Sequence, residues 1–351
     1  MKKIVFVIII IIIAAVFTCA YLLFAPATKF PGKSRYLFVS NNAPAQQQIM
    51  HQLDTGNIIR SISIFNMLAK QAKAWNNITP GRFEIKKGES IFSIVRRLRN
   101  NNQSPVRLVI NKLRIPQDFA KIIGKNFSTD SLNALNFLSN NDSLSSLGVD
   151  TNTLMTLIIP DTYFLNWTSS PKKILLRLKD YEEKFWNTDG REQKAAALNL
   201  TEKQVYTLAS IVEEETNKND EKGSIASVYI NRLNKGMPLA ADPTIKFALK
   251  DFGLKRIYYG QLSTPSPYNT YRNKGLPPGP ICTPQRVTID AVLNAPRTDY
   301  LFFVARSDFS GYHQFTANFA EHEKYAQLYQ QALNEQVKKR MQDSLNKIIQ
   351  P

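Results

Sequence analysis

Apolar and polar positions along this chain follow three patterns: one continuous apolar run, short alternating stretches, and longer stretches with helical periodicity. The continuous run extends from Ile4 to Ala25, a length of 22 residues, and is stopped by Pro26. As a helix it would rise about 33 Å, enough to cross a bilayer core of about 30 Å. A cleaved signal peptide usually has a shorter apolar core, about 7–15 residues, that ends at small residues. Because residues 21–24 (YLLF) continue the run, we expect an uncleaved membrane anchor.

The charges beside this run suggest its orientation. Lys2 and Lys3 favour a cytoplasmic N-terminus, although Lys29, Lys33 and Arg35 weaken the asymmetry. We therefore expect residues 1–3 to form a short cytoplasmic head and residues 4–25 to form the anchor. The folded part, which follows residue 30, would lie on the periplasmic (extracytoplasmic) side of the inner, cytoplasmic cell membrane, and the protein would be single-pass.

Alternating and helical stretches share the region that follows the anchor. Strands are expected at residues 34–39 (SRYLFV), around Phe83 and Ile85, and at 106–110 (VRLVI), and helices near 45–54, 63–75 and 115–127. A further helix is expected after Gly88 and Ser90, where the serine is a typical N-cap residue, with Ile91, Ile94, Val95 and Leu98 on one apolar face. Residues 34–127 are therefore predicted to form a small α+β module without an internal repeat.

The second half of the chain begins after a polar stretch. Residues 128–155 are rich in Ser, Asn and Asp, with a leucine every three or four positions. They would be either a flexible linker or short helices separated by capping residues, and the leucines favour helices. We place the connecting region here and a mixed α+β domain at residues 156–351. The predicted fold class is α+β, with an N-terminal transmembrane helix, a small module and a larger domain.

Composition narrows the choice of ligands. The chain has 45 Lys and Arg against 28 Asp and Glu, a net charge of +17 that favours an anionic partner or membrane surface. No zinc-ligand spacing, RNP-like motif or basic amphipathic helix is evident, and the positive charge is interpreted as spread along the chain, so nucleic acid is not expected. The two cysteines, Cys19 in the apolar run and Cys282 in a Pro-rich loop, provide neither a disulfide framework nor a thiolate metal site. With three histidines in the chain, a histidine metal cluster is not expected either, and neither is a cofactor.

An acidic cluster, IVEEET at residues 211–216, is the strongest candidate for chemistry. Thr201 and Gln204 form a capping-box pattern that would begin a helix at about residue 202. An apolar stripe then follows on one face, formed by Val205, Leu208, Ala209 and Val212. At about 100° per residue, Glu214 falls opposite the stripe, while Glu213 and Glu215 fall on its two flanks.

We therefore expect a different environment for each of the three glutamates. Ile211 widens the apolar sector on the Glu215 side, so Glu215 is expected to be the best buried of the three. Burial among apolar neighbours raises a carboxyl pKa, which allows proton donation near neutral pH. Glu214 is expected to be solvated, and Glu213 to be a salt-bridge partner or a residue that supports the site.

Several motifs occur in order after this cluster: IASVYINRLNKGMPLAADPTIKFAL, SPYNTYRNKGLPPGPI, TDYLFFVA, YHQF and AEH. In this order and at these spacings the chain resembles the endolytic murein transglycosylase family, also called YceG-like and MltG-type, over residues 160–322. The anchor and a module like the peptidoglycan-binding LysM fold, around residues 81–125, agree with that resemblance.

The resemblance implies a lytic transglycosylase, a carbon–oxygen lyase that acts on peptidoglycan. Members cleave the β-1,4 bond between N-acetylmuramic acid and N-acetylglucosamine within nascent glycan strands, leave 1,6-anhydro ends and so terminate strand elongation. The catalytic glutamate precedes the Thr of an E-x-E-T motif, which is Glu215 here, the residue that helical geometry also selects. Peptidoglycan synthases are expected partners at the level of the family.

Other candidate site residues have two interpretations each. In SPYNTY, Tyr268 offers a ring face and a hydroxyl to a sugar, and Asn269 either contacts sugar or satisfies its own turn, as Tyr271 more simply does. Asp242 either orients substrate or Glu215, or caps the helix that follows, the simpler choice, and Thr216 either hydrogen-bonds near Glu215 or ends the helix. Structural roles are expected for Asp161, Asn231 and Arg232, while His313 and His322 match family positions without an assigned role.

Some positions depart from the family pattern. Ala240 and Ala241 precede Asp242 where polar side chains are frequent, Phe247 stands where Tyr is common, and Gln285 where Gly is. These departures remove hydrogen-bonding groups near the expected cleft. The alternatives are a non-catalytic wall-binding or scaffold protein on the same fold, and a glycoside hydrolase that uses Asp242 or Glu213 as a second carboxylate.

Overall fold

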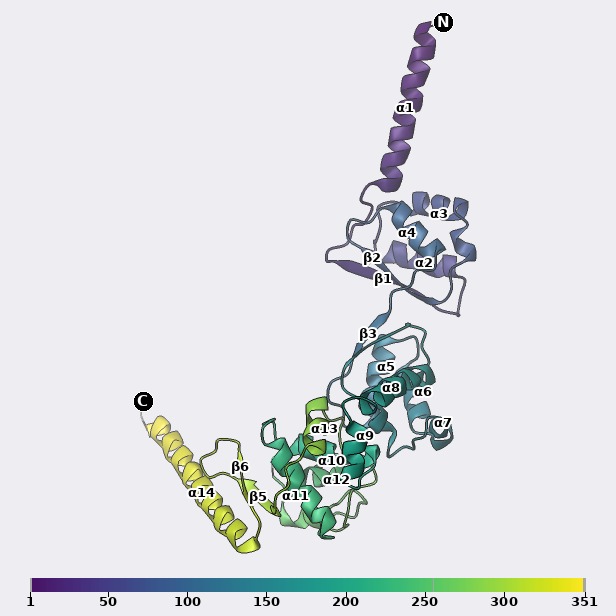
Figure 1. Cartoon of the computed structure of the whole chain (residues 1–351). Coiled ribbons are helices and arrows are strands. Elements are labelled where there is room, and N and C mark those ends of the chain that lie inside the picture. Colours follow the sequence, from purple (N-terminus) through teal and green to yellow (C-terminus); the bar gives the residue numbers. More distant parts are fainter. Residues whose placement is uncertain (1, 255, 350–351) are drawn as a thin grey trace. The chain divides into compact units, whose positions relative to one another are not determined.

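The chain folds into a mixed α+β structure with small two-stranded sheets, as the computed structural model in Figure 1 shows. The structure describes residues 2–254 and 256–349, so Met1 of the predicted head lies outside the described residues. Two compact units are present. The first comprises residues 1–108, 123–130 and 162–170, and the second comprises residues 109–122, 131–161 and 171–351. The mixed α+β class predicted from the sequence is therefore confirmed.

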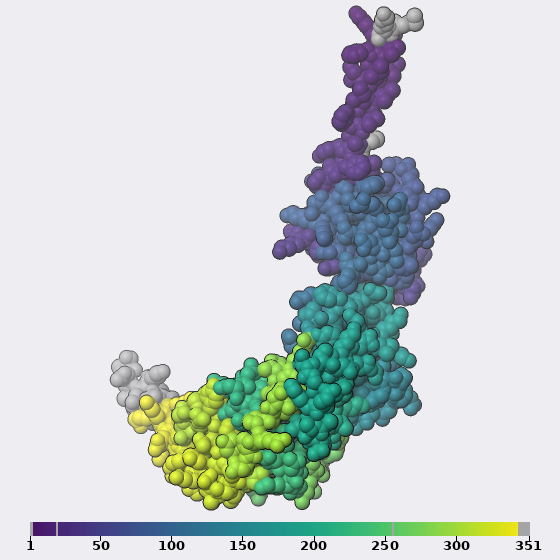
Figure 2. Space-filling model, viewed as in Figure 1, coloured from purple at the N-terminus to yellow at the C-terminus, as the bar shows by residue number. Residues whose placement is uncertain are grey.

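The predicted apolar run forms one helix, α1 (Lys2–Phe24). Its described apolar side chains are largely exposed, and the helix stands clear of the packed part of its own unit (Figures 1 and 2). Residues Lys3–Phe24 are long and apolar enough to cross a membrane, with a mean hydropathy of 3.1. An unburied helix of this composition is stable only where lipid or another apolar surface covers it.

The first unit is built on an antiparallel pair, β1 (Ser34–Val39) and β2 (Gly81–Lys86), in register from Ser34 opposite Lys86. Three helices and one turn of 3-10 helix complete it: α2 (Ala45–Thr55), α3 (Ile62–Gln71), η1 (Ala74–Asn76) and α4 (Ile91–Arg99). The Ser90 hydroxyl accepts a hydrogen bond from Ser93 N–H and caps α4 as predicted. The apolar face of α4 packs into a core with Leu37, Phe65 and Phe83.

The charges of this unit overturn two expectations. Helix α4 carries Arg96 opposite its buried face and the exposed Arg99 on a flank, while the half-buried Arg97 pairs with Glu89, so it is a basic amphipathic helix. Residues 1–108 contain 15 Lys and Arg but three Asp and Glu, and so carry +12 of the net +17. The positive charge is therefore concentrated in the N-terminal third of the chain and not spread along it.

The connecting region is helical. It is preceded in the sequence by β3 (Val106–Val109) and α5 (Pro116–Asn126). It is followed by β4 (Thr162–Leu165), which pairs with β3. Between them lie α6 (Ser131–Leu138), α7 (Asn141–Ser145) and η2 (Leu154–Leu157). Leu138, Leu144 and Leu154 are fully buried, and Asn140 caps α7. The regular leucine spacing therefore correctly indicated short packed helices, and the alternative of a flexible linker is wrong.

The rest of the second unit is mainly helical, with one antiparallel pair, β5 (Phe302–Ala305) and β6 (His313–Thr316). Its helices are α8 (Pro171–Trp186), α9 (Arg191–Ala197), α10 (Glu202–Glu215), α11 (Lys222–Asn234), α12 (Asp242–Leu249), η3 (Tyr259–Ser263), α13 (Arg286–Leu293) and α14 (Phe319–Ile349).

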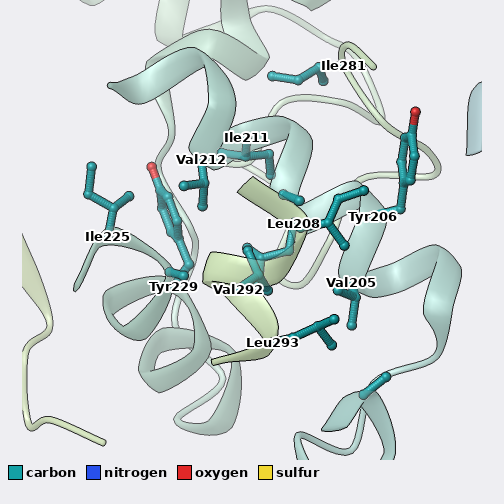
Figure 3. Packing of buried hydrophobic residues seen from close by; sticks show 14 of the residues in the cluster. Val205, Tyr206, Leu208, Ile211, Val212, Ile225, Tyr229, Ile281, Val292 and Leu293 are labelled. Carbon is teal, nitrogen blue, oxygen red and sulfur yellow. The ribbon is translucent and has the colours of Figure 1, made fainter. Parts of the chain in front are cut away.

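Helix α10 lies in the centre of this unit. Figure 3 shows Leu208 and Val212 of α10 beside Val292 of α13, and all three are fully buried. The predicted one-sided stripe is incomplete, because every residue from 205 to 213 is buried. Helices α9, α11, α12 and α13 and the η2 turn pack against α10, so the helix is enclosed by its own unit.

Candidate active site

The acidic cluster ends the central helix. The Thr201 hydroxyl accepts from Gln204 N–H while the Gln204 side chain accepts from Thr201 N–H, which confirms the predicted capping box. The helix ends at Glu215, and Thr216 is extended, with φ −144° and ψ 145°. The helix therefore begins at the capping box, and the three glutamates form its last turn.

Glu215 opens onto a cavity of about 470 Å³. We call it the Glu215 cavity, and it is lined by Glu215, Tyr229, Arg232, Leu239, Ala240, Asp242, Tyr271, Phe302, Phe303, Phe319 and His322. These residues come from α10, α11, α12, β5, α14 and the loops before and after α12, so segments far apart in the sequence form one site. Its wall is aromatic, with four polar or charged groups besides Tyr229 and Glu215.

The Glu215 carboxyl is held by one strong hydrogen bond in an apolar setting. The Tyr229 hydroxyl donates to Glu215 Oε1 at 2.5 Å, and Tyr229 is itself 1% exposed and in edge contact with Phe303. Desolvation by the surrounding protein and, to a smaller extent, the nearby Asp242 charge raise the pKa of Glu215 to about 7, against the opposing effect of the Tyr229 hydrogen bond. The pKa is therefore raised in the direction predicted from the sequence, which favours the protonated carboxyl.

A raised pKa alone does not identify the site. Burial also raises the pKa of Glu182 on α8 to about 7. Glu182 is 9% exposed and lines none of the cavities described among residues 2–254 and 256–349. What distinguishes Glu215 is that a protonatable carboxyl meets an open space large enough for a sugar.

A second carboxylate lies in the same cavity. The Tyr271 hydroxyl donates to Asp242 Oδ1 at 2.6 Å. Asp242 does not cap α12 as predicted, because Ala241 occupies the N-cap position and Asp242 is the first helical residue. Tyr271, for which the sequence favoured a turn role, lines the cavity. No local pattern in the sequence indicates this pairing, because the loop between α12 and α13 brings the two residues together.

A cationic and aromatic wall faces these acids. Arg232 donates to Leu301 O at 2.7 Å and Leu239 O at 2.8 Å, and its guanidinium lies 5.2 Å from the Phe302 ring centre. His322 stacks on the same ring at 5.3 Å, and desolvation together with the Arg232 charge lowers its pKa, so the imidazole is neutral. The structural role expected for Arg232 is confirmed, and the side chain lines the cavity as well.

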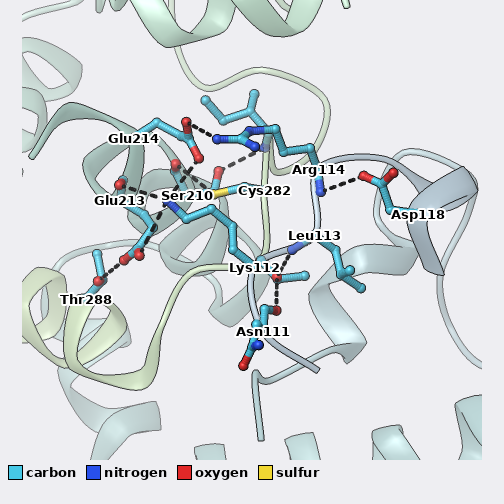
Figure 4. Close-up of polar contacts among 12 residues, drawn as sticks. Asn111, Lys112, Leu113, Arg114, Asp118, Ser210, Glu213, Glu214, Cys282 and Thr288 are labelled. Atoms are coloured by element: carbon cyan, nitrogen blue, oxygen red, sulfur yellow. Dashed lines mark hydrogen bonds and ion pairs between the residues drawn. The ribbon is translucent and has the colours of Figure 1, made fainter. Parts of the chain in front are cut away.

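The two other glutamates of the cluster form ion pairs (Figure 4). Glu213 is 5% exposed, so it, and not Glu215, is the best buried of the three. Its Oε2 lies 3.1 Å from Lys222 Nζ and accepts from the Thr288 hydroxyl. Glu214 is not solvated as expected, because Lys112 and Arg114 approach its carboxylate at 3.1 and 3.2 Å. The salt-bridge role predicted for Glu213 is confirmed.

Two predicted sugar-contact residues, Asn269 and Tyr268, lie outside the lining of the Glu215 cavity. Asn269 is fully buried, donates to Leu262 O and Thr264 O, and accepts from Tyr271 N–H, so its amide serves its own loop. Tyr268 packs on Phe247, with ring centres 4.6 Å apart, outside the cavity lining. Both predictions treated polar groups of the loop as available to a sugar. The sequence does not show which of these groups already form hydrogen bonds within the protein.

The remaining candidates form structural hydrogen bonds. Thr216 is 7% exposed, accepts from Lys218 N–H at 3.0 Å and ends α10, the simpler of its two interpretations. His313 Nδ1 lies 2.9 Å from Glu221 Oε2. Asn231 donates to Thr298 O and Tyr300 O, and Asp161 pairs with Arg286, which confirms the structural roles expected for both.

Comparison with known proteins agrees with this geometry. The model of the YceG-like family matches residues 38–328. The chain is 42% identical over 134 residues to an endolytic murein transglycosylase of Bacillus subtilis strain 168, a match that covers 37% of this chain and 36% of the relative. It is 27% identical over 290 residues to an endolytic murein transglycosylase of Streptococcus pneumoniae serotype 2 strain D39, over 74% of this chain and 52% of the relative.

A solved structure supports the fold. A crystal structure of a yceG-like protein from Listeria monocytogenes superposes with a TM-score of 0.55 at 25% identity, covering 83% of this chain and 98% of that chain. The chain belongs to the YceG-like family. The matches span about a third and about half of the length of the two curated relatives.

The buried ion pair beside the site generates a prediction. Replacing Lys222, which is 2% exposed, by Met leaves the Glu213 carboxylate with much less compensation, since Lys112 Nζ is 3.7 Å away. Breaking a buried pair on one side costs about 3–5 kcal/mol, so Lys222→Met should lower the free energy of unfolding of the second unit by about 3 kcal/mol. Urea denaturation followed by circular dichroism measures this loss.

The matched control is Lys172→Met, which removes an exposed lysine of the same unit and should change stability little. The double variant Lys222→Met, Glu213→Gln should lose less than the sum of the single variants, because the uncompensated charge is gone. A loss below about 1 kcal/mol for Lys222→Met would contradict the pairing.

Proposed function

We propose that this chain is a membrane-anchored endolytic lytic transglycosylase of peptidoglycan. It would cleave the β-1,4 bond between N-acetylmuramic acid and N-acetylglucosamine in nascent strands, leave 1,6-anhydro ends and terminate elongation. The observation that carries the proposal is the Glu215 carboxyl, with a pKa raised to about 7, at the wall of a 470 Å³ cavity. The names of the relatives support the substrate class.

One carboxyl group suffices for this reaction. Protonated Glu215 gives its proton to the bridging oxygen while the bond from that oxygen to the anomeric carbon breaks. The C6 hydroxyl of the same muramic acid residue then forms the new bond to the anomeric carbon, and its proton returns to Glu215. The attack is intramolecular, so it gains from proximity, and neither water nor a second carboxylate nucleophile is consumed.

Neighbouring groups prepare Glu215 for both steps. The Tyr229 hydroxyl occupies Oε1 and leaves the other carboxyl oxygen for the proton that is transferred. Because this bond is stronger to a carboxylate, it also stabilises the ionised state between the two transfers. The Asp242–Tyr271 pair lies in the same cavity, and we assign it to hydrogen bonding with sugar groups.

Of the four positions that depart from the family pattern, Ala240 lines the Glu215 cavity. Ala240 has φ 52°, and Ala241 is the N-cap of α12 without a capping side chain. Phe247 packs on Tyr268, and Gln285 is the N-cap of α13. Ala240 therefore removes a polar contact from the cavity itself, and we expect sugar recognition to depend more on Arg232, Asp242 and Tyr271.

The finer organisation remains a proposal. Residues 34–127 would form a LysM-like module and residues 156–351 the catalytic domain, joined by 128–155. Helix α1 would cross the inner membrane once, with the catalytic domain on the periplasmic side, because its length and mean hydropathy suit a bilayer. Peptidoglycan synthases would act beside it, since the substrate is the strand that they produce.

The alternatives differ in their products. A non-catalytic scaffold would release nothing, and a hydrolase that uses Asp242 or Glu213 would leave reducing muramic acid ends. Glu213 is committed to Lys222 and Thr288, which removes it as a free second carboxylate. Asp242 shares the cavity with Glu215, so product analysis is needed to distinguish hydrolysis from transglycosylation.

Glu215→Gln should abolish 1,6-anhydro products. The amide cannot donate the required proton, and losing a general acid lowers rates by about 10²–10⁴-fold. The measurement is mass spectrometry of purified glycan strands after incubation with the full chain in detergent. Reducing ends in place of anhydro ends from the unaltered chain would establish a hydrolase, and no product from folded protein would favour the scaffold.

The matched control is Glu182→Gln. Glu182 shares the raised pKa of Glu215 but not the cavity, so its loss should leave anhydro product formation within about twofold. Equal loss of activity in both variants would contradict the assignment of Glu215.

Tyr229→Phe should move the pH dependence in a defined direction. The hydroxyl stabilises the Glu215 carboxylate, so its removal raises the pKa of Glu215 above about 7. A general acid works in its protonated form, so kcat/KM falls as pH rises through that pKa. The alkaline limb of the pH profile should therefore shift to higher pH, with a lower maximum rate.

Tyr268→Phe serves as the control, because the Tyr268 hydroxyl contacts Asn152 and not Glu215. Its alkaline limb should coincide with that of the unaltered chain. An unshifted limb in Tyr229→Phe, or a shift to lower pH, would contradict the role given to the hydrogen bond.

A further inference from the structure

The end of α1 is packed against the first unit of the chain. The Phe24 ring lies 5.0 Å from the ring of Phe92, in the first turn of α4. Ala27 N–H donates to Glu89 O, and Gly88 N–H donates to the Thr28 hydroxyl at 2.8 Å. The turn before α4 therefore lies directly beside the last residues of the apolar helix (Figure 1).

Exposed cations surround this junction. We call them the basic collar: Lys29, Lys33, Arg60, Lys86, Lys87 and Arg96, all exposed. Backbone hydrogen bonds tie the segments that bear them to the end of α1, since Arg60 N–H donates to Ala27 O and Lys87 N–H to Lys33 O. Arg96 lies 5.9 Å from the centre of the Phe92 ring. Among residues 2–254 and 256–349, no side chain of the collar forms an ion pair.

Acidic groups do not neutralise the collar. Residues 1–108 contain Asp54, Glu84 and Glu89 as their three acids, against 15 Lys and Arg. Of these acids, Glu89 lies in the collar turn and is paired with Arg97. The collar therefore carries a net positive field at the place where the apolar helix ends.

We propose that the basic collar binds the anionic phospholipid headgroups of the membrane that α1 spans, so that the first unit rests on the bilayer surface. The inference rests on the proposed anchor but not on its orientation, since either leaflet can supply anionic headgroups. Phe24 is the last residue of α1 and contacts Phe92, so an α1 that spans a bilayer would place both rings near the membrane interface. Cations within a Debye length of an anionic surface are attracted to it, by about fivefold in the binding constant for each one.

The shape of the junction favours lipid over a wall polymer. A soluble polyanion would meet the collar from the side of the aqueous phase, whereas these cations lie near a helix end that a bilayer would cover. Lys29 lies five residues after Phe24, so an inserted α1 places it within the headgroup layer. Arg60 is held near Lys29 by its backbone hydrogen bond to Ala27, and Arg96 lies beside Phe92, the ring that contacts Phe24.

The test uses the full chain in nanodiscs made of phosphatidylcholine alone, or of phosphatidylcholine and phosphatidylglycerol in equal parts. Hydrogen exchange followed by mass spectrometry reports on residues 86–99. With phosphatidylglycerol, exchange there should slow several-fold, and added salt should reverse the slowing. Exchange that is equal in both lipids would overturn the proposal.

The variant that tests the collar is Lys29→Gln, Lys87→Gln, Arg96→Gln, which should lose the lipid dependence. Its matched control removes three exposed cations of the second unit, Lys172→Gln, Arg177→Gln and Lys274→Gln, and should keep it. Slowing by phosphatidylglycerol that persists in the collar variant would contradict the assignment. Slowing by isolated murein in place of phosphatidylglycerol would identify a wall-binding face and also overturn it.

The proposed catalytic function is tested separately in the same preparations. Glu215→Gln should retain the full response to phosphatidylglycerol while losing anhydro products. A chain that cleaves glycan without the lipid response would refute the collar alone. Failure of the chain to enter nanodiscs would refute the anchor and the collar together, and leave Glu215 untouched.

Discussion

The site depends on the desolvation of one carboxyl group at the end of a buried helix. Glu215 follows nine consecutive buried residues of α10 and faces a cavity whose wall is largely aromatic. Low polarity on the protein side favours the protonated carboxyl, while the open side lets a substrate reach it. The Tyr229 hydroxyl limits the shift, so the pKa is raised to about 7 and not far beyond, which suits a group that must both give and accept a proton.

Three adjacent glutamates therefore serve three purposes. Glu213 is paired with Lys222 in the core, and Glu214 with Lys112 and Arg114, which belong to the segment before α5. These pairs hold the last turn of α10 from two directions, so the Glu215 backbone is positioned by neighbours whose charges are already satisfied. Buried pairs contribute little net stability, but they disfavour other arrangements of the same turn.

Local signals in the sequence were sufficient for many of the elements. The capping box at Thr201, the Ser90 cap and the leucine spacing of residues 128–155 each depend on a few neighbouring residues, and the structure has them all. The predicted order of burial of the three glutamates was wrong. A one-sided apolar stripe predicts a helix at the surface, whereas α10 is enclosed by its neighbours. Asn269 and Tyr271 were misjudged for a related reason, since the partners of a loop side chain come from residues that only the fold brings near.

The distribution of charge along the chain was also predicted wrongly. The net charge of the whole chain does not indicate where the cations lie. Most of the excess positive charge belongs to residues 1–108, and Arg96 of α4 belongs to a cationic surface beside the end of α1. The chain would then meet the membrane through an apolar helix and a charged face together. The second unit has its own polar network and cavity, and the chemistry proposed for it requires neither feature.

The most direct test of the central claim is a carbon-13 NMR titration of the glutamate side-chain carboxyls, with the Glu215 signal assigned by comparison with Glu215→Gln. An apparent pKa near 7 for that signal is the predicted result, since desolvation raises the pKa of Glu215 to about 7. A signal that titrates near 4.5, the ordinary value for glutamate, would show a solvated carboxyl and contradict the proposed proton transfer.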